Sequence, residues 1–133
     1  MTHTDHVDLI RIRGICSRFP EAEESTLQDR PLFHVRRRRF AIFNDDNLPD
    51  RKRWEGFGRS LHFVADQRLL IQLKSDSRFI ASPHHGFRGW MSFDLAHGKV
   101  DWSWIDELLF LAYRHVANKQ LLNELDKSAD RLA

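Results

Sequence analysis

The segment over residues 90–117 constrains the fold most, because its hydrophobic period changes from two to about 3.6 along the chain. Residues 90–95 alternate, so that Trp90, Ser92 and Asp94 share one face of a predicted strand. After a turn at residues 97–99, apolar side chains recur every three or four positions. They are Ile105, Leu108, Leu109, Ala112 and Val116. A strand followed by a long amphipathic helix predicts a sheet covered by helices.

The remaining segments are shorter, and they complete an α+β pattern. The predicted elements are a helix over 5–19, strands over 32–35, 40–43, 61–64 and 79–81, and a short helix over 67–74 after Asp66. With the segment above, the order is α-β(3)-α-β(2)-α. We therefore predict one α+β domain over residues 1–133, in which helices pack on an antiparallel sheet. Its core spans about 7–122, with a polar loop at 44–59 and a tail at 126–133.

The composition is that of a globular protein, with 41% hydrophobic and 30% charged residues in 133. No apolar run reaches the roughly 20 residues that span a bilayer, and residues 1–6 lack the features of a secretory signal. One cysteine, Cys16, points to a reducing compartment. We expect a cytoplasmic protein of bacterial type that does not bind membranes.

Positive charge is concentrated in the middle of the chain, where residues 30–59 hold nine basic and four acidic side chains. Most of this charge lies on a predicted hairpin and the loop after it. The candidate nucleic-acid-binding residues are Arg36, Arg37, Arg38, Arg39, Arg51, Lys52 and Arg53. The guanidinium fork matches phosphate, and engaging about five phosphates gives a salt slope near −4.5. The alternative is a solvated hairpin tip paired with Asp45, Asp46 or Asp50.

A second candidate site is a small polar pocket that binds an anion or a protein partner. Its residues are His85, Arg88, Trp90 and Tyr113. The alternative is a structural turn, in which Trp90 packs beside Trp102 or Trp104. The adjacent histidines at 84 and 85 lack the three or four convergent ligands that zinc requires, so we predict no metal or cofactor.

The sequence gives little support for catalysis. Cys16 lies among apolar helix positions, which predicts an inert buried thiol. No serine lies in a nucleophile elbow, and there is no glycine-rich phosphate loop. Trp102 and Trp104 are expected to anchor the long helix to the core. An enzyme remains an alternative, because catalytic groups need not be adjacent in sequence.

Several of these segments together resemble the MmcQ/YjbR family of small bacterial proteins, from about residue 7 to 122. The matching segments are 16–24 (similar to C…LPG-x-EE), 33–35 and 39–41 (F-x-V…K-x-F-A), 88–95 (GW-V-x-L-x-L), and 101–102 with 112–116 (DW…SYRLV). The chain departs from the pattern at Glu21, at Ala112 and at Arg36, Arg37 and Arg38. The resemblance implies the α-β(3)-α-β(2)-α fold, in a family for which a winged DNA-binding role has been proposed from shape.

Taken together, we predict a non-enzymatic binding module of the MmcQ/YjbR type that binds DNA through its basic hairpin and loop. The rival hypotheses are a protein- or ligand-binding domain that uses the face near Arg88 and Trp90, and an uncharacterised enzyme.

Overall fold

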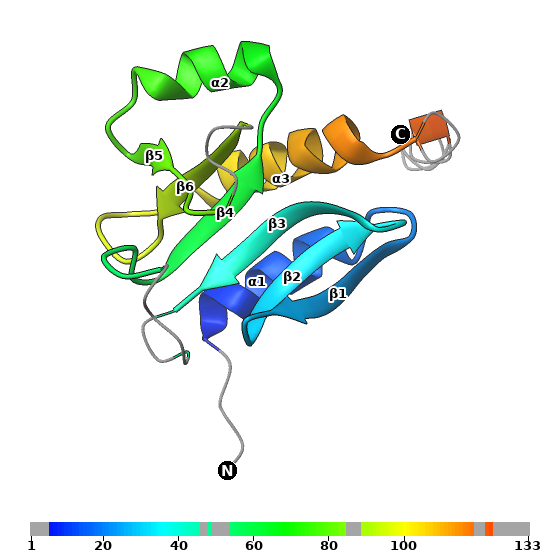
Figure 1. Cartoon of the computed structure of the whole chain (residues 1–133), viewed down its shortest axis with the longest axis horizontal. Coiled ribbons are helices and arrows are strands. Elements are labelled where there is room, and N and C mark those ends of the chain that lie inside the picture. Colours follow the sequence, from blue (N-terminus) through cyan, green and yellow to red (C-terminus); the bar gives the residue numbers. More distant parts are fainter. Residues whose placement is uncertain (1–5, 46–47, 49–53, 85–88, 119–121, 124–133) are drawn as a thin grey trace.

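The chain forms a six-stranded antiparallel sheet with two helices packed on one face and a third at its edge (Figure 1). A computed structural model describes residues 6–45, 48, 54–84, 89–118 and 122–123. Its elements are α1 (Val7–Cys16), β1 (Ala22–Leu27), β2 (Arg30–Val35), β3 (Arg38–Asn44), β4 (Ser60–Val64), α2 (Gln67–Lys74), β5 (Phe79–Ala81), β6 (Trp90–Asp94) and α3 (Trp102–Val116). The strands lie in the order β1-β2-β3-β4-β6-β5. The predicted α+β class and antiparallel sheet are confirmed.

One strand is additional to the predicted order, which becomes α-β(4)-α-β(2)-α. The sequence of β1, AEESTL, is exposed along most of its length and has no apolar face for a pattern to detect. It pairs with β2 through a two-residue turn in which Gln28 and Asp29 have φ of 51° and 64°. Such a turn matches the twist of two antiparallel strands. Backbone hydrogen bonds to β2 therefore hold this edge strand in the sheet, although the strand has no apolar face.

The helix-covered face of the sheet holds the aromatic core. Tyr113 of α3 stacks on Phe19 at 4.8 Å and meets Phe40 edge-on at 5.8 Å between ring centroids. Trp104 packs edge-on against Phe79 at 5.1 Å. Trp104 therefore anchors α3 to the sheet as predicted. In the described residues no helix combines the length and the apolar character needed to cross a bilayer.

The opposite face of the sheet is unusual because it buries polar side chains. Arg30 is fully buried; its Nε donates to Asn44 Oδ1 at 2.7 Å, and its guanidinium lies 4.9 Å from the Trp54 ring centroid. Next to them, His62 lies between the hydroxyls of Ser60 and Ser82, both 2.8 Å away. This face thus contains a hydrogen-bonded polar layer instead of a second apolar core.

Candidate functional site

The turn of the β2–β3 hairpin presents four consecutive arginines to solvent. Val35 pairs with Arg38, and the two residues between them, Arg36 and Arg37, have φ of 46° and 72°. Positive φ at both central positions is the geometry of a type I′ turn, which glycine and asparagine usually occupy. Side chains other than glycine cost about 1–2 kcal/mol each in that conformation. The hairpin therefore carries local strain to keep arginine at its tip, and strain of this kind is often found at functional positions.

Two of these arginines contact other parts of the chain. Arg36 forms a two-point ion pair with Glu21, in which Nε and Nη2 lie 3.2 and 2.7 Å from the carboxylate oxygens. Arg38 donates from Nη1 to the carbonyl oxygen of Val116, at the end of α3, over 3.4 Å. These contacts bring the hairpin, the segment after α1 and the end of α3 together. A cation also suits this position, because the carbonyl end of a helix is partially negative.

The other two arginines, Arg37 and Arg39, are exposed and form no side-chain hydrogen bond or ion pair with any described residue. Arg114, in the last turn of α3, is exposed in the same way. Among the described residues, no contact of the Arg114 side chain joins it to the hairpin.

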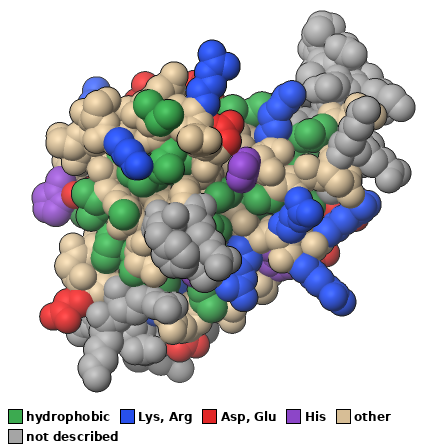
Figure 2. Space-filling view, turned by 45° about the horizontal axis from the view of Figure 1, so that its top comes forward, with side chains coloured by type: hydrophobic (Ala, Val, Ile, Leu, Met, Phe, Trp, Pro, Cys, Tyr) green, Lys and Arg blue, Asp and Glu red, His purple; other side chains and the backbone are tan. Residues whose placement is uncertain are grey.

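We call the four arginines at 36–39 the basic end. Its acidic neighbours are Glu21, which is already paired with Arg36, and Glu23. Glu23 of β1 pairs with His34 of β2, and His34 pairs on its other side with Arg39 of β3. Four arginines and two glutamates leave a net charge of two positive. In Figure 1 the hairpin turn and the end of α3 point to the right, and Figure 2 shows Lys and Arg side chains gathered on that side. A positive surface of this kind attracts polyanions.

Three aspartates were expected to neutralise the hairpin arginines, and the structure describes one of them. Asp45 follows the other end of β3, beyond the Asn44–Ser60 pair, and forms no described ion pair. Asp46 and Asp50 lie outside the described residues. The counter-ion that is found, Glu21, lies 15 residues before Arg36 and was not predicted.

The remaining nucleic-acid candidates, Arg51, Lys52 and Arg53, also lie outside the described residues. Their part in nucleic-acid binding therefore stays a prediction.

The second predicted group, His85, Arg88, Trp90 and Tyr113, does not come together among the described residues. His85 and Arg88 lie outside them. Tyr113 is fully buried under the helix-covered face, where its hydroxyl donates to the carbonyl oxygen of Pro20 at 2.8 Å. Trp90 is 6% exposed and alternates onto the opposite face, edge-on to His84 at 4.6 Å. It therefore packs beside neither Trp102 nor Trp104, contrary to the expectation for a structural turn.

The pair of Ser60 and His62 has the hydrogen-bonded geometry of a nucleophile and a base, but it is sealed in the interior. Both residues are fully buried, and the rings of Trp54 and Phe57 lie 4.9 and 5.3 Å from the imidazole. Burial lowers the pKa of His62 to about 3, and His84 and Arg30 add to the effect. Because the His62 imidazole is a weak base and is enclosed in the interior, we assign it to the packing of the sheet. Among described residues, no three His, Cys, Asp or Glu side chains converge to hold a metal.

Comparison with known proteins gives one informative match. No protein-family model and no curated protein matches the chain. Among solved structures, the crystal structure of protein DR2400 from Deinococcus radiodurans, a DUF419 domain, superposes with a TM-score of 0.66. The match covers 89% of this chain and 87% of that one at 19% identity. DUF419 is the MmcQ/YjbR family, so the chain shares its overall α+β fold with a protein of the family that it resembles, with one strand more than the resemblance implied. At this identity the likeness extends to the fold alone.

Proposed function

We propose that this protein is a non-enzymatic module of the MmcQ/YjbR type that binds DNA through its basic end. The observation that carries the proposal is the exposure of Arg37 and Arg39 without an acidic partner among the described residues. Surface arginines commonly lie beside carboxylates, as Arg13 and Arg18 do here with Glu24 and Asp106. Guanidinium groups left unneutralised at a strained turn are available to phosphate.

The shape of the hairpin supports a duplex as the partner. Arg38 pairs beside Val35 and reaches toward α3, whereas Arg39 is the next residue along and points to the other face of the hairpin. Because β1 pairs with β2 as far as Val35, the hairpin turn is the end of a broader sheet. Its arginines can therefore contact the phosphates along one side of a duplex. These contacts go to phosphates, so the proposal is for binding with little sequence preference.

Two further parts of the hypothesis extend this proposal. Arg51, Lys52 and Arg53 would make further contacts with the phosphates. The module would act in a bacterial cytoplasm, where DNA is present and the thiol of Cys16 stays reduced. The rival surface near Arg88 and Trp90 has less support, because Trp90 is buried against His84.

The test is fluorescence anisotropy of a labelled duplex of about 20 base pairs, titrated with the full chain at about 50 mM salt. The double variant Arg37→Glu/Arg39→Glu changes the net charge by four units and leaves the Arg36–Glu21 pair intact. The matched control, Arg68→Glu/Lys74→Glu, makes the same change on two exposed residues of α2. We expect the first variant to lose at least about tenfold in affinity and the control much less. No binding by the wild type, or equal losses in both variants, would remove the proposal.

A further inference from the structure

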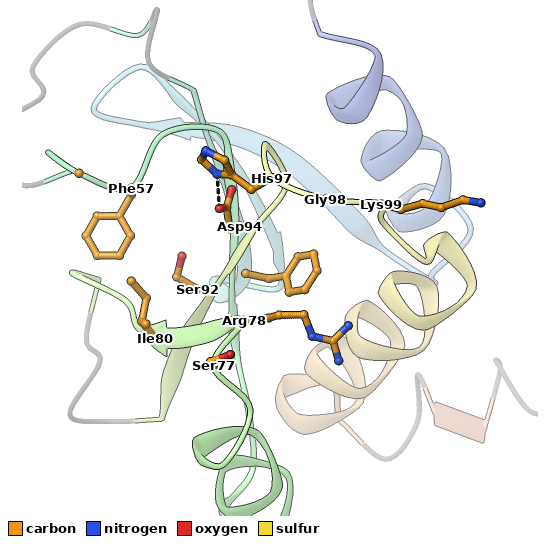
Figure 3. Close-up of a pocket in the computed structure, with 11 residues that line it drawn as sticks. Phe57, Ser77, Arg78, Ile80, Ser92, Asp94, His97, Gly98 and Lys99 are labelled. Carbon is orange, nitrogen blue, oxygen red and sulfur yellow. Dashed lines mark hydrogen bonds and ion pairs between the residues drawn. The ribbon is translucent and has the colours of Figure 1, made fainter.

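A cavity of about 510 Å³ lies at the β5–β6 edge of the sheet (Figure 3). Its volume falls within the range of roughly 300–1,000 Å³ typical of small-molecule sites. All of the residues around it are described, and they come from β5, β6, the turns beside them and the segment before β4. The basic end lies elsewhere, at the turn of the β2–β3 hairpin, so the cavity is a separate feature.

The register of three neighbouring strands determines which side chains meet in one part of this cavity. Ser92 of β6 pairs with Ile80 of β5 on one side and with His62 of β4 on the other. Residues paired in this way project from the same face of the sheet, with Cβ atoms about 4.5–5.5 Å apart. The Phe57 ring packs against His62, with ring centroids 5.3 Å apart. Ser92 therefore has an aliphatic neighbour on one side and aromatic neighbours on the other.

The hydroxyl of Ser92 forms no hydrogen bond with any described residue, although Ser92 is only 3% exposed. Its neighbour His62 cannot pair with it, because each ring nitrogen already lies 2.8 Å from the hydroxyl of another serine. In Figure 3 the Ser92 hydroxyl points into the cavity. Buried hydroxyls are usually hydrogen-bonded, so this one is available to a polar atom of a ligand.

The walls beside this hydroxyl are apolar. Ile80 is 54% exposed, one of the few large hydrophobic side chains so placed in the described chain. Phe57 is half-buried, and Figure 3 draws it on the same side of the cavity as Ile80. Exposed apolar groups around a concave surface are typical of ligand sites. This part of the cavity therefore suits an apolar body that carries one polar group.

The charged groups of the lining are already paired or point away. The carboxylate of Asp94 pairs with His97, and the guanidinium of Arg78 pairs with Asp76. The Lys99 side chain extends away from the β5–β6 pair in Figure 3. A charged ligand beside the apolar walls would lose water without meeting an opposite charge. The site therefore favours a neutral ligand.

From this arrangement we infer that the cavity binds a small neutral molecule made of an aromatic ring and one hydroxyl group. The ring packs on Ile80 and on the Phe57 ring, because aromatic rings pack favourably on one another. The ligand hydroxyl shares a hydrogen bond with Ser92, which can donate or accept. A hydrocarbon of the same shape keeps the apolar contacts and loses the hydrogen bond. The Ser92 hydroxyl therefore determines which aromatic molecules bind best.

The test measures binding from amide chemical shifts of the ¹⁵N-labelled full chain. The probes are benzyl alcohol and 2-phenylethanol, each beside its hydrocarbon, toluene or ethylbenzene. We expect saturable shifts in β5 and β6 with at least one alcohol, and about fivefold weaker binding of its hydrocarbon, the size expected for one neutral hydrogen bond. Benzoate and benzylammonium, which carry opposite charges, should both bind more weakly than that alcohol.

Two variants separate the polar contact from the apolar one. Ser92→Ala should weaken binding of the alcohol about fivefold and leave that of the hydrocarbon unchanged. Ile80→Ala should weaken binding of both. The matched controls are Ser25→Ala on β1 and Ile71→Ala on α2, which replace exposed residues outside the cavity lining and should change neither affinity.

Both test variants can be measured as folded proteins, because Ser92→Ala removes no hydrogen bond to a described residue and Ile80 is exposed. Four outcomes overturn the inference: no saturable shift with either alcohol, equal affinity for alcohol and hydrocarbon, tighter binding of benzoate or benzylammonium, or unchanged alcohol affinity in Ser92→Ala. None of these depends on whether the basic end binds DNA.

Discussion

The Nδ1 atom of His62 lies 2.8 Å from the hydroxyl oxygen of Ser82, and both side chains are buried. On the other side of the ring, Nε2 lies 2.8 Å from the hydroxyl of Ser60. Because hydroxyls can donate as well as accept, the neutral imidazole is fully satisfied in this setting. Protonation would place a charge in the interior beside Arg30, where nothing in the cluster offsets it.

The first prediction concerns stability at acidic pH. The pKa of His62 falls from an ordinary 6.5 to about 3 in the folded chain, so between these values the unfolded chain binds a proton that the folded chain does not. This contribution to stability is complete above pH 6.5 and is lost as the pH falls toward 3, by roughly 1 kcal/mol per unit. His62→Gln removes it. Urea unfolding of both proteins between pH 7.5 and 4.5 should show their stability difference shrinking with acid. Parallel profiles would contradict the assignment.

The second prediction is that Arg30→Lys strongly destabilises the fold. The buried guanidinium binds Asn44 Oδ1 from Nε and the Gln28 carbonyl oxygen from Nη1, at 2.7 and 2.6 Å. An ammonium cannot reproduce this fork, and the buried charge would lose its partners. We expect a loss of about 2–4 kcal/mol in the free energy of unfolding. The exposed control Arg39→Lys should change it by less than about 0.5 kcal/mol. Similar small changes in both variants would refute the role given to Arg30.

The third prediction contrasts two glycines. Gly89 has φ of +92°, and a Cβ there would lie 2.9 Å from the carbonyl oxygen of Ala65. Gly89→Ala should therefore cost about 2 kcal/mol or more. Gly14, inside α1, has open space around the same position, so Gly14→Ala should stabilise by about 0.5–1 kcal/mol through helix propensity. Thermal unfolding measures both, and a stable Gly89→Ala would show that β6 begins with a different backbone.

The fourth prediction is that Cys16 is unreactive in the folded protein. Burial raises the pKa of its thiol far above the ordinary value, and Glu24 and Asp106 add to the rise. Reaction with a thiol reagent at pH 7.5 should be about a hundredfold or more slower than in guanidinium chloride. Equal rates in the two conditions would mean that the α1 face is open.

The elements that the sequence predicts well are those with their own local signals. Asp101 and Asp66 are local signals of this kind, because they cap α3 and α2: Asp101 accepts from the N–H of Ser103, and Asp66 from that of Leu69. The alternation in β6 places Phe93 toward α3, as its pattern indicates. These features depend on neighbours within four residues, which sequence patterns record.

Features that depend on distant partners could not be predicted. Nothing in the sequence distinguishes Arg30 from a surface arginine. It is buried because Asn44 and Trp54, 14 and 24 positions away, enclose it. The positive φ of Arg36 and Arg37 could not be predicted, because neither position holds the glycine or asparagine that usually signals it. For the same reason the pairing of Arg36 with Glu21, 15 positions earlier, could not be predicted. Their roles follow from the meeting of separate elements.

The most direct test of the proposed function is the salt dependence of duplex binding. If Arg37, Arg38 and Arg39 each neutralise one phosphate, log affinity should fall against log salt concentration with a slope of about −2.7 or steeper. Removing one contact in Arg37→Ala should make the slope shallower by about 0.9, whereas Arg68→Ala should leave it unchanged. A slope near zero, or the same slope in wild type and Arg37→Ala, would contradict binding through the basic end.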